Sequence, residues 1–476
     1  MAGRSDLQSP INGIFWLQDQ DDHLPGLLTL TSRWPRVELF GNITPPFITE
    51  SPRTMIPATD GAEELVIHGR IEGGTFQGWS GRVSLIRAHT RQRRMQLAGA
   101  GPIRQVLESQ YAVLGGHIFE PEARFSAARI RVQNIDDWVS LPVFNATMGM
   151  SDPRITVSYT PQKIPSTFLP GNIGLLSFHS TRSWTPPSSR GTAISTNTWL
   201  ELRFDGGYTI DSIRYQFVAP VSALMTILYG VDCPPVDLEV YDEDTQRWLK
   251  VFAYEIATES EDNPPAPLMR LNELGCEQFA NWIGVFRDLA PIPAILTGTI
   301  IDKSRAVENR LIELAMAAEG LHRRLNPDGR RISEEDVRRG LATLEKAPLP
   351  EEVRKVVSDA LRIYLWDHSF PVRIADLANQ VSSAAPNVCG KVNRWKRAIT
   401  NARNGFAHSL PEETESSYEQ ILINNSLAES LRWLLTIRLL QETGAEDLAI
   451  SNALVDHRDY RLFLSQAKEI LPRIYG

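Results

Sequence analysis

The residues at 403–408, Arg-Asn-Gly-Phe-Ala-His, bring a guanidinium, an amide and an imidazole together within one short stretch. A guanidinium suits the binding of a phosphate group, and an imidazole suits proton transfer near neutral pH. An amide can position either partner by hydrogen bonding. The types and spacing of Arg403, Asn404 and His408 therefore suit chemistry on a phosphodiester.

The element that must position these side chains is a predicted helix over 387–408. Apolar residues recur there at steps of three and four, which is the period of a helix with one buried face. This stripe comprises Val392, Trp395, Ile399, Ala402 and Phe406. The opposite side carries Arg394, Arg397, Asn401, Asn404 and His408, and the stretch contains no Asp or Glu. Arg403 lies at the edge of the stripe, and its side chain is long enough to reach the polar side.

The same residues match the Arg-Asn-x-x-x-His motif of HEPN-domain ribonucleases. A long β-like half followed by a helical domain resembles the ApeA-like anti-phage HEPN proteins. The resemblance implies RNA cleavage by attack of the ribose 2′-hydroxyl, which leaves a 2′,3′-cyclic phosphate and needs no metal or other cofactor. It also implies a tRNA target cut in the anticodon loop, and defence by abortive infection. Arg403 would hold and stabilise the phosphate, His408 would transfer a proton or orient the attacking hydroxyl, and Asn404 would orient His408 or the ribose.

HEPN families bring two copies of the motif together across a dimer, so the resemblance implies a homodimer. Three other interpretations remain open. The first is a solvated helix face whose terminal histidine interacts with the helix dipole. The second is a non-catalytic dimeric module that binds nucleic acid or another ligand. A toxin paired with an antitoxin would share the chemistry and differ only in its regulation.

Several neighbouring residues are candidate accessories. Arg394 and Arg397 lie on the motif's side of the helix and could form a phosphate track that leads to the motif, or could be ordinary surface charges. Lys391 faces elsewhere and is a weaker candidate. Glu319 and His322 lie on a second predicted helix over 304–325. Glu319 could pair with Arg403 or His408 and set its protonation state, or could form an ordinary surface ion pair.

Composition narrows the class of protein. The chain has 476 residues, 42% of them hydrophobic and 22% charged, so two or three globular domains are expected. The formal net charge of −8 excludes a bulk nucleic-acid binder, and any RNA contact must be a local basic patch. The three cysteines predict neither a disulfide framework nor a zinc site, and no metal-ligand motif is present. We expect a cytoplasmic protein without a signal peptide or membrane span.

The order of the chain predicts an α+β multidomain protein. Residues 1–258 form a β-rich N-terminal domain, barrel- or sandwich-like, in which short apolar runs alternate with Gly and Pro turns. It also contains one helix over 212–229 and a hairpin over 238–252. An acidic, proline-rich linker spans 259–267. Residues 268–476 form an all-α HEPN bundle, with further helices over 271–289, 351–366, 372–382, 418–443 and 459–475 and a helix N-cap at Ser333.

Three tryptophans of the β-rich domain are candidates for a ligand-binding surface. Trp79, Trp138 and Trp184 could line a binding surface, but burial in the sheet core is the default interpretation. His368 and His457 stand alone in the sequence and are interpreted as structural or surface residues. Because a constantly active RNase would kill its host, we expect this domain to restrain the nuclease or to sense a phage-derived trigger.

Overall fold

The computed structural model describes residues 9–18, 20, 22–30, 34–44, 47–51, 54–57, 65–76, 78–94, 103–141, 144–148, 155–160, 164–188, 191–260, 262, 264–365, 367–407 and 418–476. The side chains of 47–51, 54–57, 76, 94, 144, 146, 148, 155, 183, 186–188, 191, 192, 364, 406 and 407 lie outside this description. The chain separates into two compact units. The first has the bounds Met1–Met225, Cys233–Pro265 and Arg270–Asn272, and the second has the bounds Thr226–Asp232, Ala266–Met269 and Glu273–Gly476.

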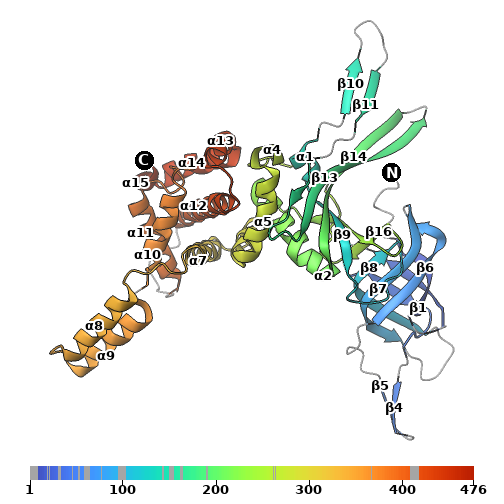
Figure 1. Cartoon of the computed structure of the whole chain (residues 1–476), viewed down its shortest axis with the longest axis horizontal. Helices are drawn as coiled ribbons and strands as arrows, with labels where there is room; N and C mark the ends of the chain where they lie inside the picture. The colour runs from blue at the N-terminus through green and yellow to red at the C-terminus, as the bar shows by residue number, and fades with distance from the viewer. Residues whose placement is uncertain are drawn as a thin grey trace. The chain divides into compact units, whose positions relative to one another are not determined.

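Six of the described strands in the first unit close into a barrel (Figure 1). They are β1 (Ile11–Leu17), β2 (Leu24–Thr29), β3 (Arg36–Leu39), β6 (Leu65–Phe76), β7 (Trp79–Arg94) and β8 (Arg104–Leu114). The order around the barrel is β8, β3, β2, β1, β6 and β7, and β7 pairs again with β8. Phe15 belongs to the buried core of these strands. Its ring lies so close to Gly69 that a Cβ there would meet a ring carbon at 2.5 Å.

The same sheet continues beyond the barrel, because β16 pairs with β8. The order onward is β16 (Arg247–Ala253), β15 (Pro235–Asp242), β9 (Phe125–Val132), β14 (Gly191–Tyr208), β13 (Gly174–Ser188) and β12 (Thr167–Phe168). Two separate hairpins are β4 (Phe47–Ser51) with β5 (Thr54–Pro57), and β10 (Phe144–Met148) with β11 (Ile155–Tyr159). The predicted hairpin over 238–252 is confirmed, with Leu238 opposite Val251. The β-rich, barrel-like fold predicted for this half is therefore confirmed.

Short helices accompany these strands. They are α1 (Ile135–Val139), α2 (Ile210–Ile213), a π-helical turn at Arg214–Val218 and α3 (Ala219–Tyr229). The last three confirm the helix predicted over 212–229. Trp138 on α1 is fully buried, as expected, and Trp79 is half-buried. For Trp184 the expectation of burial is wrong, since its side chain is 60% exposed. β13 and β14 extend as a hairpin past the pairing of β14 with β9, so among the described residues no third strand pairs with the hairpin beside Trp184.

The second unit is helical, which confirms the predicted bundle (Figure 1). After the short α4 (Leu271–Leu274) come α5 (Cys276–Asp288), α6 (Ile292–Ile301), α7 (Val307–Leu325), α8 (Glu334–Lys346), α9 (Glu351–Ala360), a π-helical turn at Leu361–Leu365, α10 (Phe370–Gln380), α11 (Val392–Ala407), α12 (Tyr418–Glu442), α13 (Asp447–Asp456), α14 (Arg458–Ile470) and α15 (Pro472–Tyr475). The longest, α12, is buried along most of its length and packs against α7 and α14. Its leucines at helical spacing supply the centre of the bundle.

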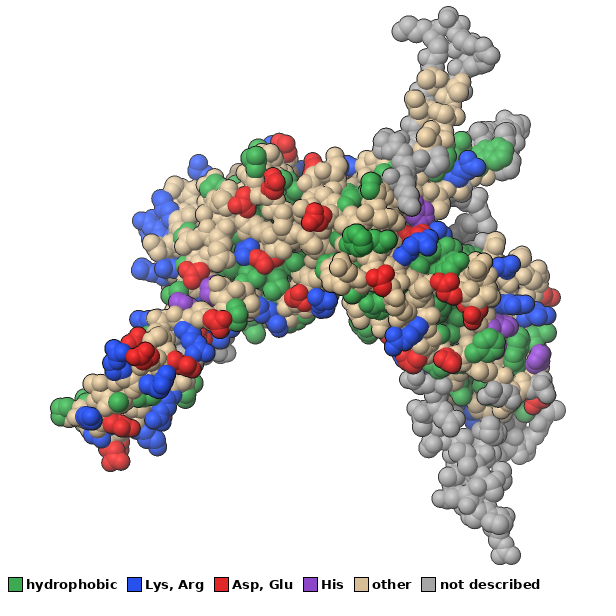
Figure 2. Space-filling view, in the orientation of Figure 1, with side chains coloured by type: hydrophobic (Ala, Val, Ile, Leu, Met, Phe, Trp, Pro, Cys, Tyr) green, Lys and Arg blue, Asp and Glu red, His purple; other side chains and the backbone are tan. Residues whose placement is uncertain are grey.

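One helix pair stands away from this bundle. α8 and α9 pack on each other and project past α7 and α10 (Figure 1). No residue of α8 is buried, and Figure 2 shows charged side chains of both signs over the pair. Ser333 caps α8 as predicted, because its side chain accepts a hydrogen bond from the Asp336 backbone N–H.

Several predicted helix bounds are corrected. The helix expected over 271–289 is divided at Gly275, whose φ of +95° is a left-handed conformation that ends α4. The helix expected from residue 304 begins at Val307, because Asp302 accepts the Ser304 backbone N–H and holds a turn before it. α6 and α13 were not predicted. α6 is apolar around its whole circumference, so no one-sided pattern marks it as a helix.

No single helix among the described residues is long and apolar enough to cross a membrane, although the bent pair of α5 and α6 passes that test jointly by length and composition. The three cysteines are free thiols; Cys233 and Cys389 are buried and Cys276 is partly exposed. Burial raises the pKa of the Cys389 thiol well above its ordinary value.

Candidate active site

The helix that carries the Arg-Asn motif is α11. Its apolar stripe forms the buried face that the spacing predicts, since Trp395 and Ile399 are fully buried. Trp395 Nε1 donates a hydrogen bond to Ser430 Oγ of α12 at 2.8 Å, so the indole satisfies its one donor inside the core. Arg397 and Asn404 are exposed on the other side. α11 is therefore fixed by its buried face and presents its polar face outward.

α11 begins at Val392 and not at residue 387, which corrects the prediction. Gly390 adopts φ +53°, and a Cβ there would lie 2.5 Å from the carbonyl oxygen of Ile474. The Lys391 backbone N–H donates to that same oxygen at 2.8 Å. Close packing of the chain end against 387–391 therefore replaces the first predicted turn of helix.

The two arginines predicted to bind RNA differ in their surroundings. Arg394 Nη1 donates to the carbonyl oxygen of Arg473 at 2.8 Å, so this side chain helps to hold α15. Arg397 is exposed on the same helix. Lys and Arg side chains gather over α11 and α15 in Figure 2. RNA binding by Arg394 and Arg397 stays a prediction, and for Arg394 it would add to a structural contact.

Arg403 is half-buried where α7, α10 and α11 meet. Its Nη2 donates to Glu319 Oε2 on α7 at 3.2 Å, and its guanidinium carbon lies 4.4 Å from the centre of the Phe370 ring on α10. A guanidinium over an aromatic face is attracted by the ring electrons. Glu319 thus contacts Arg403, one of the two partners considered for it, and these contacts hold Arg403 from two sides.

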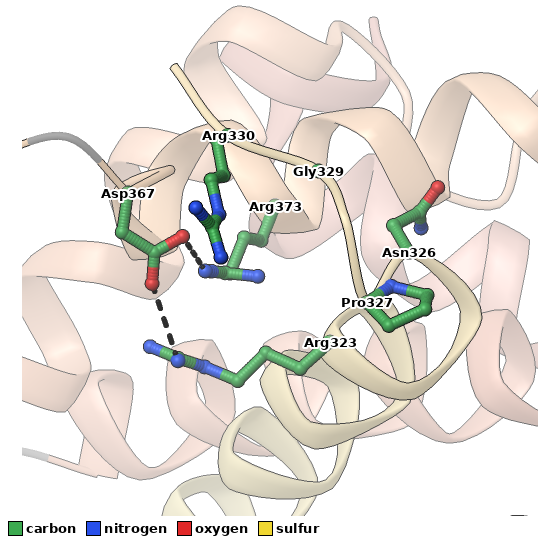
Figure 3. Close-up of a pocket in the computed structure, with 7 residues that line it drawn as sticks. All are labelled: Arg323, Asn326, Pro327, Gly329, Arg330, Asp367 and Arg373. Atoms are coloured by element: carbon green, nitrogen blue, oxygen red, sulfur yellow. Dashed lines mark hydrogen bonds and ion pairs between the residues drawn. The ribbon is translucent and has the colours of Figure 1, made fainter. Parts of the chain in front are cut away.

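Glu319 also links Arg403 to a second group of charges. Its Oε1 accepts from Arg323 Nη2 at 3.2 Å, and Arg323 Nη1 lies 3.2 Å from Asp367 Oδ2. Asp367 Oδ1 in turn accepts a short hydrogen bond from Arg373 on α10 (Figure 3). Arginines and carboxylates thus alternate along a continuous path that starts at Arg403.

His322 lies at the buried end of this path and is only 3% exposed. Arg373 Nη1 lies 3.3 Å from His322 Nδ1, and His322 Nε2 lies 3.3 Å from Asp376 Oδ2. Because a guanidinium can only donate, Nδ1 must be the acceptor and Nε2 must carry the proton. Burial lowers the pKa of His322 below its ordinary value, and the guanidinium of Arg373 acts in the same direction against the hydrogen bond to Asp376. Two contacts therefore hold the imidazole inside the helical unit, and its ring is 6.3 Å from that of His368.

The predicted site residues are thus only partly observable. Arg403 and Asn404 are on the last turns of α11, whereas His408 lies outside the described residues. Sequence reasoning missed Phe370, Asp367, Arg323 and Arg373. No spacing rule connects α10 with residues on α7. Among the described residues, no group of three or more His, Cys, Asp or Glu side chains could hold a metal ion.

The fold and this site define a two-part protein, in which a β-barrel unit precedes a HEPN helical bundle. The family model for ApeA N-terminal domain 1 matches residues 10–282, and the model for Apea-like HEPN matches residues 312–447. The first match alone covers more than half of the 476 residues, so the chain belongs to the ApeA-like family of anti-phage HEPN proteins. The HEPN match supports a nuclease of the RNase class, in a domain type that commonly binds RNA and dimerises. Comparison with curated proteins and with solved structures gave no significant match.

Proposed function

We propose that the protein is a metal-independent endoribonuclease whose site is built around Arg403, Asn404 and His408. The observation that carries the proposal is the placement of Arg403. Its guanidinium is aligned by Glu319 and Phe370 and remains 32% exposed, so it is held in position and can still reach a ligand. A guanidinium prepared in this way suits a transition state in which negative charge grows on a phosphate.

The proposed reaction follows from what these groups can do. The ribose 2′-oxygen loses its proton and attacks the adjacent phosphorus, and the bond to the 5′-oxygen of the next nucleotide breaks. The products are a 2′,3′-cyclic phosphate and a 5′-hydroxyl. Arg403 stabilises the charge on the phosphate, and His408 transfers a proton or orients the attacking hydroxyl. Asn404 orients His408 or the ribose.

One motif per chain supplies one imidazole and one guanidinium, whereas the reaction needs a base, an acid and charge stabilisation. We infer that two chains pair through their HEPN domains and that the two motifs form one composite site. The proposed substrate is tRNA cut in the anticodon loop, and the proposed setting is the cytoplasm of an infected cell. The exposed basic face of α11, with Arg394 and Arg397, would guide the RNA backbone toward Arg403.

The β-barrel unit is proposed to restrain the nuclease until a phage-derived trigger binds. Its size, and the absence of a catalytic motif in its sequence, support a regulatory role. Cleavage of tRNA would then follow infection, which fits defence by abortive infection.

The test compares wild-type protein with His408→Ala on purified tRNA in EDTA. A ribonuclease should lose its cleavage in the variant while RNA binding and thermal stability are kept. A non-catalytic binding module would give no cleavage with either protein and unchanged RNA binding. If the wild type is silent in vitro, growth arrest on phage infection is compared between the same two proteins. Arrest with both proteins would contradict the proposal.

A further inference from the structure

A cavity opens beside the site, between the end of α7 and the start of α10 (Figure 3). Three arginines line it, together with a turn of the chain and one carboxylate: Arg323, Asn326, Pro327, Gly329, Arg330, Asp367 and Arg373. The turn holds its shape through backbone hydrogen bonds, from Asn326 to His322 and from Gly329 to Asn326. The cavity is therefore a built feature of the fold, with a positively charged wall.

The deepest of these arginines is fixed before any ligand arrives. The Arg373 side chain is 2% exposed; its Nε donates to the carbonyl oxygen of His368 at 2.9 Å, and its other nitrogens contact Asp367 and His322. Each guanidinium has five N–H donors, and the contacts to Glu319 and Asp367 occupy only part of those of Arg323. Guanidinium N–H donors on the cavity wall therefore remain available to bind a ligand with several acceptor oxygens.

The volume of the cavity limits the ligand. It is about 210 Å³, which is below the roughly 300–1,000 Å³ of pockets that enclose drug-sized molecules. A cavity of this size accepts a phosphate group and part of the attached sugar, while the rest of the nucleotide stays outside. Bidentate binding of phosphate oxygens is the contact for which arginine is best suited.

The cavity is also coupled to the proposed catalytic arginine. Arg323 lies in its wall, and one carboxylate, that of Glu319, bridges Arg323 to Arg403. The two guanidiniums are thus separated by the width of a single carboxylate. A polyanion that reaches Arg403 can place another of its phosphates at this wall.

We propose that this cavity is a subsite for a backbone phosphate of the RNA, next to the phosphate that is cleaved. The proposal rests on the proposed ribonuclease function. Arg330 stands at the mouth of the cavity and contacts the incoming phosphate, and Arg323 and Arg373 form its inner wall. The subsite sets how the strand is positioned, and it takes no part in the bond changes.

The test uses the full-length chain with His408→Ala, so that bound RNA is not cut. Arg330→Glu is compared with Arg331→Glu, which makes the same change of charge one residue away at a position that does not line the cavity. Arg330 contacts Glu334 at the surface, and a thermal unfolding curve checks that its replacement leaves the fold intact. We expect Arg330→Glu to raise the Kd for tRNA about tenfold or more, and Arg331→Glu to change it less than about threefold. The slope of log Kd against log salt should fall by about 0.7 in Arg330→Glu alone, the loss of one phosphate contact on a single strand.

If both variants weakened tRNA binding equally, the subsite proposal would be overturned, because binding would then depend only on the total charge of the protein. Wild-type cleavage, measured in parallel, separates this failure from failure of the ribonuclease proposal. A selective loss of binding, with no wild-type cleavage in vitro and no growth arrest on phage infection, would keep the subsite and remove the nuclease. A competition with AMP distinguishes the source of the phosphate. AMP that binds through Arg330 and does not displace tRNA would assign the cavity to a free nucleotide and overturn the proposal.

Discussion

Glu319 accepts a hydrogen bond from Arg403 at 3.2 Å, although the two residues lie 84 positions apart in the sequence. The carboxylate is 19% exposed and the guanidinium 32% exposed, so the pair lies at the edge of the helical unit. Glu319 contacts Arg323 with its other oxygen. It therefore aligns the motif arginine and connects it to the arginine-lined cavity.

Replacing this carboxylate should alter turnover more than folding. Glu319→Gln keeps the size of the side chain and removes its charge, so the carboxylate that aligns Arg403 is lost. The effect on folding should be small, because an ion pair near the protein surface contributes only about 1 kcal/mol to stability. We expect the single-turnover cleavage rate at saturating RNA to fall about tenfold, because small misplacements of a catalytic group have effects of this size or larger. Glu319→Asp should recover part of the rate. A faster Glu319→Gln enzyme would mean that Glu319 withholds Arg403 from RNA.

Trp395 lies on the buried face of α11, so its replacement should lower the stability of the protein. Trp395→Ala removes a fully buried indole and should lower the free energy of unfolding by about 3–5 kcal/mol. Trp395→Phe loses the hydrogen bond to Ser430 and should lose about 1–2 kcal/mol. Arg397→Ala on the exposed face is the control, expected to lie within about 0.5 kcal/mol of wild type. Urea unfolding measures all three, and a Trp395→Ala protein as stable as wild type would contradict the packing described.

The buried His322 predicts a dependence of stability on pH. Its pKa is lowered in the folded protein, so the unfolded chain binds the proton more readily. Stability from this residue is complete above the unfolded pKa of about 6.5 and is lost as pH falls through the lower folded value. The melting temperature should therefore decline from about pH 7.5 to about pH 5.5, and less so in His322→Gln. The pKa values of His117 and His457 are also lowered by burial, so the variant should flatten the profile only in part.

The proposed restraint by the β-barrel unit can be tested without truncation. Removing residues 1–260 would also remove Thr226–Asp232, which belong to the helical unit. A protease site inserted between residues 263 and 264 cuts the full-length chain and leaves every residue present. We expect cutting to raise the rate of tRNA cleavage. An unchanged or lower rate would contradict restraint and favour a role in substrate delivery.

The parts of this protein that were predictable from sequence are those with local signals. The stripe of Trp395 and Ile399 marks the buried face of α11, and the strand pair around Leu238 and Val251 is marked by its turn. Closure of the barrel is not marked in this way, because it depends on β7 pairing with β8 through contacts that no short pattern records. The start of α11 was missed for a related reason, since Gly390 and Ile474 meet only in the folded chain.

The candidate site was predictable to a similar extent. Arg403 and Asn404 are identified by a motif, and Glu319 by its place on an earlier helix. Asp367 and Arg373 belong to the same network only because α10 packs beside both α7 and α11. Asp367 and Arg373 are close in the sequence, as the partners of many surface ion pairs are, so their spacing alone does not mark them as part of a site. The burial that makes Arg373 unusual is a property of the tertiary structure alone.

The most direct test of the account is the chemistry of the RNA ends. Wild-type protein and Arg403→Ala are incubated with tRNA in EDTA, once both are known to be folded, and the new 3′ ends are analysed. We expect fragments ending in a 2′,3′-cyclic phosphate from the wild type, and cleavage at least about hundredfold slower from Arg403→Ala. Equal, measurable cleavage rates for the two proteins, or fragments with a free 3′-hydroxyl, would contradict the central claim that Arg403 supports attack by the ribose 2′-hydroxyl.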